Sequence, residues 1–152
     1  MHIQSESPYQ PDVAPLFAQL HAMHAAFYPD APNTPMPLAT LMQPEVRFLV
    51  ARDDAGQAIG CVALVPRGPS HDYAEIKRMI VTEAARGQGI GRALLEQLAL
   101  HALAAGIHVL KLTTGVRQRE ALALYERFGF TRCAPYGEGG TGPDEVCMEK
   151  RL

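Results

Sequence analysis

The segment from Arg86 to Leu95, RGQGIGRALL, combines residue types that bind anions. Glycines occupy positions 87, 89 and 91, arginines flank them, and an apolar pattern with helical spacing follows. The first N–H groups of a helix have no partner within the helix, and the helix dipole places partial positive charge there. Glycines would let a pyrophosphate approach these amides, and Arg86 and Arg92 would add full charges. The segment therefore predicts a phosphate-binding turn, with an ordinary tight turn as the alternative.

Three known phosphate-binding motifs can be compared with this turn. A P-loop ends in Gly-Lys-Ser/Thr, but Gly91 is followed by Arg92 and Ala93, which leaves no magnesium ligand. The dinucleotide fingerprint reads GxGxxG with an acidic residue ending the next strand, whereas this turn reads GxGxG and LTTG ends the next strand. The pattern Arg/Gln-x-x-Gly-x-Gly/Ala is satisfied by Arg86, Gly89 and Gly91. The third pattern is therefore the best match.

A second motif, REALALYERFGF, occupies residues 119–130. Together the two motifs resemble the GNAT superfamily of acetyl-CoA-dependent N-acetyltransferases, whose second motif reads Asn-x-x-Ala-x-x-Leu-Tyr-x-x-x-Gly-Phe. The matching positions here are Ala121, Leu124, Tyr125, Gly129 and Phe130. Gln118 stands where the family has asparagine, which weakens any role assigned to that side chain. The resemblance is strong from Ala74 to Phe130, and the order of elements in the rest of the chain agrees with it.

The resemblance implies a site for acetyl-CoA as co-substrate. The turn would hold the CoA pyrophosphate with backbone amides, and the preceding strand end would pair with the pantetheine arm like an added strand. Strands 73–81 and 108–113 would splay apart to make the slot. The residues expected to bind the co-substrate are Met79, Ile80, Val81, Arg86, Gly87, Gln88, Gly89, Ile90, Gly91, Arg92 and Gln118.

Acetyl transfer from a thioester to an amine needs a neutral amine, a polarised carbonyl and a proton for the leaving thiolate. Backbone N–H groups near Met79–Val81 could polarise the carbonyl. Tyr125 is the candidate acid, because a phenol with a pKa near 10 stays protonated at neutral pH. The alternative is a core aromatic residue packed with Leu122 and Phe128. The match of the surrounding motif favours the catalytic interpretation.

The candidate general base is Glu75. It resembles the catalytic glutamate of the histone-acetyltransferase branch of the superfamily, which lies at the same distance from the end of the equivalent strand. The alternative is a solvated surface carboxylate on the same side as Lys77, since side chains alternate along a strand. His71 and Asp72, in the preceding loop, are weaker candidates.

The acceptor side carries no motif. The proline-rich segment Tyr28–Pro37 falls where such enzymes shape the acceptor site, and Tyr28 and Asp30 could recognise a cationic amine. Tyr136 and Glu138 are similar loop candidates. His21 and His24 lie three residues apart in a predicted helix but have no visible third ligand, so we expect a polar helix face bordering the acceptor cleft and no metal site.

We expect direct transfer in a ternary complex to a primary amine of a small molecule or peptide. The alternatives are an enzyme acting on a protein lysine or N-terminus, and a regulator that binds acyl-CoA without catalysis. The C-terminal strands could pair in a homodimer.

These residues need elements to position them, and the pattern predicts one α/β domain over residues 1–152. Apolar spacing and turn signals predict a mixed, largely antiparallel sheet with helices on both faces and one strand–helix–strand crossover. The expected helices cover residues 12–27, 38–42, 91–106 and 119–129. The expected strands cover the first few residues and then 47–53, 57–66, 73–81, 108–114, 130–134 and 144–150.

Composition restricts the class of protein further. A net charge of −2 and a pI near 6.3 argue against a nucleic-acid or anionic-membrane binder. Cys61, Cys133 and Cys147 are odd in number and widely spaced, which favours free thiols over a disulfide framework or zinc site. The N-terminus lacks a signal-peptide pattern, and no apolar run is long enough for a membrane helix. We therefore expect a cytoplasmic protein.

Overall fold

The computed structural model describes residues 1–31, 36–137 and 142–152. In chain order the elements are β1 (His2–Ser5), α1 (Ala14–Phe27), α2 (Leu38–Leu41), β2 (Arg47–Arg52), β3 (Ala58–Arg67), β4 (Tyr73–Val81), the 3₁₀ turn η1 (Glu83–Ala85), α3 (Ile90–Ala104), β5 (Val109–Gly115), α4 (Arg119–Phe128), β6 (Thr131–Arg132) and β7 (Glu145–Arg151).

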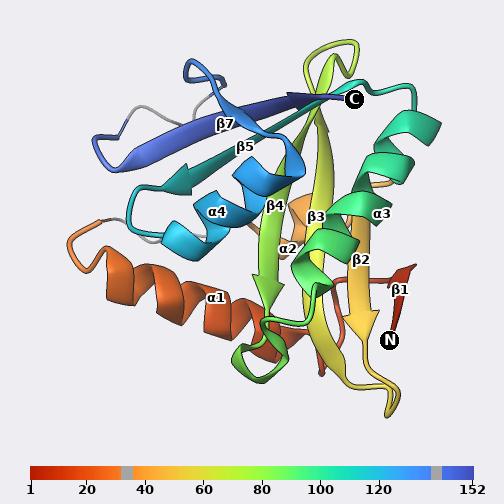
Figure 1. Cartoon of the computed structure of the whole chain (residues 1–152). Coiled ribbons are helices and arrows are strands. Elements are labelled where there is room, and N and C mark those ends of the chain that lie inside the picture. Colours follow the sequence, from red (N-terminus) through yellow and green to blue (C-terminus); the bar gives the residue numbers. More distant parts are fainter. Residues whose placement is uncertain (32–35, 138–141) are drawn as a thin grey trace.

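The strands form one sheet in the order β1-β2-β3-β4-β5-β7-β6. Every neighbouring pair is antiparallel except β4 and β5, which are parallel and connected through α3. Helix α1 covers one face of the sheet, and α3 and α4 cover the other (Figure 1). The mixed sheet and single parallel crossover confirm the predicted fold class.

Each face of the sheet has its own apolar core, because side chains alternate along the strands. In β2, Phe48 and Val50 pack under α1, whereas Leu49 packs under α3. Leu16 of α1 and Leu94 of α3 are each almost fully buried in their respective cores. The two cores hold the helices that carry the pocket side chains at fixed positions relative to β4 and β5.

Several predicted boundaries shift by a residue or more. The first helix was expected from residue 12, but α1 begins at Ala14 and has no side-chain cap. The Asp12 carboxylate instead accepts a hydrogen bond from Arg52 at the end of β2. Asp12 is therefore bound by a charged side chain of β2 and does not cap α1. The strand expected over residues 130–134 is confined to Thr131–Arg132.

Candidate active site

The pocket lies where β4 and β5 separate. Their parallel register covers only Ala74 with Leu110 and Glu75 with Lys111, although β4 continues to Val81 and β5 to Gly115. A cavity of about 1110 Å³ opens between the diverging ends and extends to α1, α3 and α4. The predicted splaying of these strands is thus present in the structure.

A β-bulge at Arg78 accompanies the separation. The β3–β4 register shifts between Cys61 and Ala63, and Arg78 adopts a φ of 56°. Such a φ is costly for a residue with a Cβ, and bulges bend the strand that contains them. The Cys61 thiol donates to the Arg78 carbonyl at 3.3 Å, which holds the bulge against β3. The bend turns the end of β4 away from β5.

The glycine turn leads from η1 into the start of α3. Gly89 has a φ of 79° and is the N-cap of α3, so glycine is required there by the left-handed backbone. A Cβ added at Gly87 or Gly89 would meet no atom within 4 Å, so the backbone here is open to a ligand. Arg86 and Arg92 also line the pocket. Open amides at the positive end of a helix, beside two guanidinium groups, form a site that fits a pyrophosphate.

Gly91 lines the pocket and also has a packing function that the sequence did not predict. A Cβ at Gly91 would approach Leu124 Cδ2 to 2.9 Å and Met79 Cε to 3.4 Å. Gly91 therefore allows α3 to approach α4 and β4 closely. The helix also begins at Ile90, one residue before the predicted start.

Most residues predicted to bind the co-substrate meet at this pocket. Those that line it are Met79, Ile80, Val81, Arg86, Gly87, Gly89, Ile90, Gly91, Arg92 and Gln118. Gln88 is exposed and is not among the lining residues. Gln118 is the N-cap of α4 and makes no side-chain capping bond.

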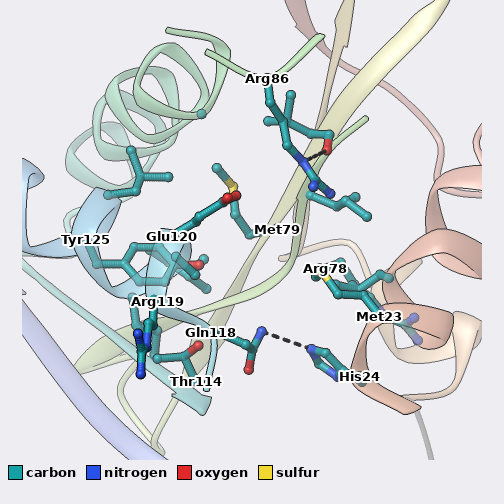
Figure 2. A pocket seen from close by; sticks show the side chains of 18 of the residues that line it. Met23, His24, Arg78, Met79, Arg86, Thr114, Gln118, Arg119, Glu120 and Tyr125 are labelled. Carbon is teal, nitrogen blue, oxygen red and sulfur yellow. Dashed lines mark hydrogen bonds between the residues drawn. The ribbon is translucent and has the colours of Figure 1, made fainter. Parts of the chain in front are cut away.

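Tyr125 extends from α4 into the pocket from the side opposite α1 (Figure 2). Its side chain is only 6% exposed, and the ring stacks edge-on against Phe130 at 5.8 Å. Burial raises the pKa of the Tyr125 hydroxyl well above its usual range. Within the described part of the chain this hydroxyl has no hydrogen-bond partner. The phenol is therefore kept protonated and can donate to a group in the pocket.

Glu75 lies on the α1 side of the sheet, outside the pocket lining. Arg67 Nε donates to its Oε1 at 3.1 Å, and the Tyr136 hydroxyl donates to its Oε2 at 3.1 Å. Lys77, which does line the pocket, pairs with Oε2 at 3.2 Å. The structure thus places Lys77, and not this predicted base, in the pocket lining. Both carboxylate oxygens of Glu75 already have hydrogen-bond or ion-pair partners.

His24 is a pocket residue that the sequence pattern did not single out as a base. It lies half-buried on α1, and its Nε2 is 3.3 Å from Nε2 of Gln118 on α4 (Figure 2). Burial, followed by the charges of His21 and Arg78, lowers the pKa of the His24 imidazole below 6.5. The ring is therefore neutral at pH 7 and able to accept a proton. His21 and His24 both line the pocket, as expected for a polar helix face at the cleft.

The end of α1 is tied to the loop between β5 and α4. Arg117 Nη1 donates to the Phe27 carbonyl at 2.6 Å, and the Arg117 backbone N–H donates to the Tyr28 hydroxyl at 3.1 Å. Tyr28 also packs directly on Gly115, where a Cβ would overlap its hydroxyl. Tyr28 is thus a structural contact rather than a lining residue. In the proline-rich segment, residues 32–35 lie outside the described residues, as does Glu138.

The chain matches the model of the acetyltransferase (GNAT) family over residues 17–130. It belongs to this family and is an acyltransferase. The IAA acetyltransferase of Azospirillum brasilense is 42% identical over 152 residues, covering 99% of this chain and 97% of that protein.

Solved structures show the same fold. A Klebsiella pneumoniae protein assigned as an acyl-CoA N-acyltransferase superposes with a TM-score of 0.82 at 31% identity, covering 99% of this chain and 97% of that one. A Bacillus anthracis protein assigned as a streptothricin acetyltransferase, solved with acetyl coenzyme A, has a TM-score of 0.62 at 21% identity. That match covers 75% of this chain and 66% of the other.

Proposed function

We propose that this protein transfers an acetyl group from acetyl-CoA to a primary amine of a small molecule or peptide. The observation that carries the proposal is a single pocket that joins the open glycine turn at the start of α3 to the hydroxyl of Tyr125. A protein of the same fold, crystallised with acetyl coenzyme A, supports the choice of acyl donor.

Acetyl-CoA supplies the acetyl group as a thioester. The amine attacks the carbonyl carbon of this thioester directly. The amides of residues 87–91, with Arg86 and Arg92, bind the pyrophosphate. The free edge of β4 at Met79–Val81 binds the pantetheine arm. Its backbone N–H groups donate hydrogen bonds to the carbonyl oxygen of the thioester.

The proton balance needs one acid and one base. The new C–N bond forms as the C–S bond breaks, the amine proton passes to the base, and Tyr125 donates a proton to the leaving sulfur. Glu75 remains a proposed base from the sequence, but its carboxylate is engaged by Arg67, Lys77 and Tyr136. His24 lines the pocket with a neutral imidazole, so the geometry favours His24 for this step.

Thiol release from acetyl-CoA, measured against a panel of primary amines and peptides, tests the proposal. We expect release that depends on both acetyl-CoA and an amine, with a matching acetylated product by mass spectrometry. Acetyl-CoA that binds and stabilises the protein without thiol release for any amine would indicate a binding protein. A protein that acetyl-CoA does not stabilise against heat would contradict the proposal altogether.

A further inference from the structure

Arg78 brings a positive charge to the acceptor side of the pocket. The bulge in β4 places this residue on the side of the sheet covered by α1, and its side chain lies beside Met23 and His24 (Figure 2). Its guanidinium packs 4.9 Å from the centre of the Phe17 ring, and its Nη2 donates to the Met36 carbonyl at 2.6 Å. These contacts fix the group next to the cavity that it lines.

Arg78 has no acidic partner in the part of the chain that the structure describes. Within residues 1–31, 36–137 and 142–152, no carboxylate forms an ion pair with Arg78. The side chain is half-buried, and burial lowers the pKa of its guanidinium. A partly desolvated cation without a counter-charge is stabilised by an anion that enters the pocket.

The pocket as a whole is basic although the chain has a formal charge of −2. Its described lining holds the cations Lys77, Arg78, Arg86, Arg92, Arg117, Arg119 and Arg127 and the acids Glu120 and Glu145. Arg86 and Arg92 flank the glycine turn and serve the pyrophosphate. Lys77 already pairs with Glu75, and Arg117 is exposed to solvent, whereas Arg78 is half-buried. Arg78 is therefore the basic group on the α1 side that is best suited to a second anion.

We propose that Arg78 binds a carboxylate or phosphonate of the acceptor, so that the preferred acceptor is a small primary amine that also carries an acidic group. This inference rests on the proposed acetyl transfer and names its substrate class. Arg78 presents a planar fork of donors that matches two oxygens of such an acid. His24 lines the pocket beside Arg78 (Figure 2) and would receive the proton of the amine.

The binding experiment titrates the full chain, saturated with CoA, with matched amines by calorimetry. Glycine, β-alanine and 4-aminobutyrate are each compared with their amides, and 3-aminopropylphosphonate distinguishes phosphonate from carboxylate. We expect at least one acid to bind about 10- to 100-fold more tightly than its neutral-capped partner, the range for hydrogen bonds to charged groups.

Arg78→Met is expected to remove this preference while leaving the affinity for CoA unchanged. Arg78→Lys should keep part of it and serves as the second variant if Arg78→Met does not fold. The matched control is Arg47→Met, because Arg47 is also an arginine bound to a backbone carbonyl, that of Pro44, but is exposed and is not among the pocket-lining residues. That control should bind like the wild type.

The outcomes separate the two proposals. Equal affinity for acids and amides would overturn the anion site. So would an Arg78→Met variant whose affinity for CoA falls by the same factor as its affinity for the acids. Acid binding that depends on Arg78 without thiol release from acetyl-CoA would contradict acetyl transfer and keep the anion site. Thiol release that is as fast with the amides as with the acids would keep acetyl transfer and overturn the anion site.

Discussion

The Tyr125 hydroxyl is the end of an otherwise buried side chain, and it meets the cavity on the side opposite α1. A thiolate leaving group accepts a proton from a phenol only if the phenol is still protonated. Burial ensures this by raising the pKa of Tyr125. The residue therefore has both the position and the protonation state that an acid requires.

Tyr125→Phe should lower kcat by about 100-fold or more, the usual contribution of a positioned acid. The affinity for acetyl-CoA should change little, because the ring and its contact with Phe130 are retained. Thiol release gives kcat, and calorimetry gives the affinity. A kcat within about twofold of the wild type would show that Tyr125 is only a core residue.

His24 and Glu75 can be separated by the pH dependence of kcat. If His24 is the base, activity falls as the pH falls through its pKa, which lies below 6.5, because the imidazolium cannot accept a proton. His24→Gln should lower kcat by about 100-fold and abolish this acid limb. Glu75→Gln should keep the limb and change kcat less. Loss of the limb in Glu75→Gln alone would assign the base to Glu75.

At the scale of elements, the pocket depends on how α1 is attached to the far side of the slot. Tyr28, at the end of α1, packs against Gly115 at the end of β5, and Arg117 joins the two segments. This contact also brings His24 within 3.3 Å of Gln118. The clamp, formed by Tyr28, Gly115 and Arg117, therefore sets the distance between α1 and α4.

Gly115→Ala should break this clamp. The new Cβ would overlap the Tyr28 hydroxyl, and overpacking of this kind costs about 1–3 kcal/mol. We expect a lower free energy of unfolding in urea and a higher KM for the acceptor, with acetyl-CoA affinity nearly unchanged.

The matched test combines Gly115→Ala with Tyr28→Leu, because the second change removes the hydroxyl that the new Cβ would overlap. The double variant should be more stable than the sum of the two single changes predicts. Strict additivity would show that Gly115 and Tyr28 do not depend on each other.

For the whole molecule, the N-terminal segment is fastened to the sheet by charge. Arg52 at the end of β2 donates to both oxygens of Glu6 and to Asp12, and both side chains of the Arg52–Glu6 pair are mostly buried. The hydrogen bond from Arg52 lowers the pKa of Glu6, despite an opposing effect of burial. This network holds the segment that precedes α1 and thus one wall of the pocket.

The stability supplied by Glu6 is present above its unfolded pKa near 4.5 and is lost as the pH falls through its lowered folded pKa. Arg52→Met should remove about 1–3 kcal/mol of unfolding free energy at pH 7 and flatten the acid dependence below pH 4.5. Urea unfolding at several pH values measures both effects. An unchanged acid dependence in Arg52→Met would show that other carboxylates control acid unfolding.

Two expectations for the whole molecule stay predictions. The homodimer is tested by sedimentation velocity at several protein concentrations, and the cytoplasmic location by cell fractionation. Across residues 1–31, 36–137 and 142–152, the structure has no helix with the length and apolar character needed to cross a bilayer.

The fold and the binding turn could be predicted because their signals are local. Gly89 permits the left-handed backbone at the start of α3, and Gly129 ends α4 with a φ of 104°. Apolar runs separated by turn residues placed the strands, and Gly129 marked the end of α4. Gly91 shows the limit of this reasoning, because its contact with Leu124 depends on the packing of two helices.

The sequence by itself determined the family and the order of the elements, and it predicted that the glycine turn and Tyr125 belong to the site. Only the tertiary structure decided that Arg78 lies beside the cavity with no carboxylate partner among the described residues, that Glu75 is engaged by three side chains, and that His24 faces Gln118. His24 and Gln118 are 94 residues apart in the chain, and Glu75 and Tyr136 are 61 apart. The physical reason is that charge and pKa depend on burial and on neighbours from other elements, and folding alone brings those neighbours together.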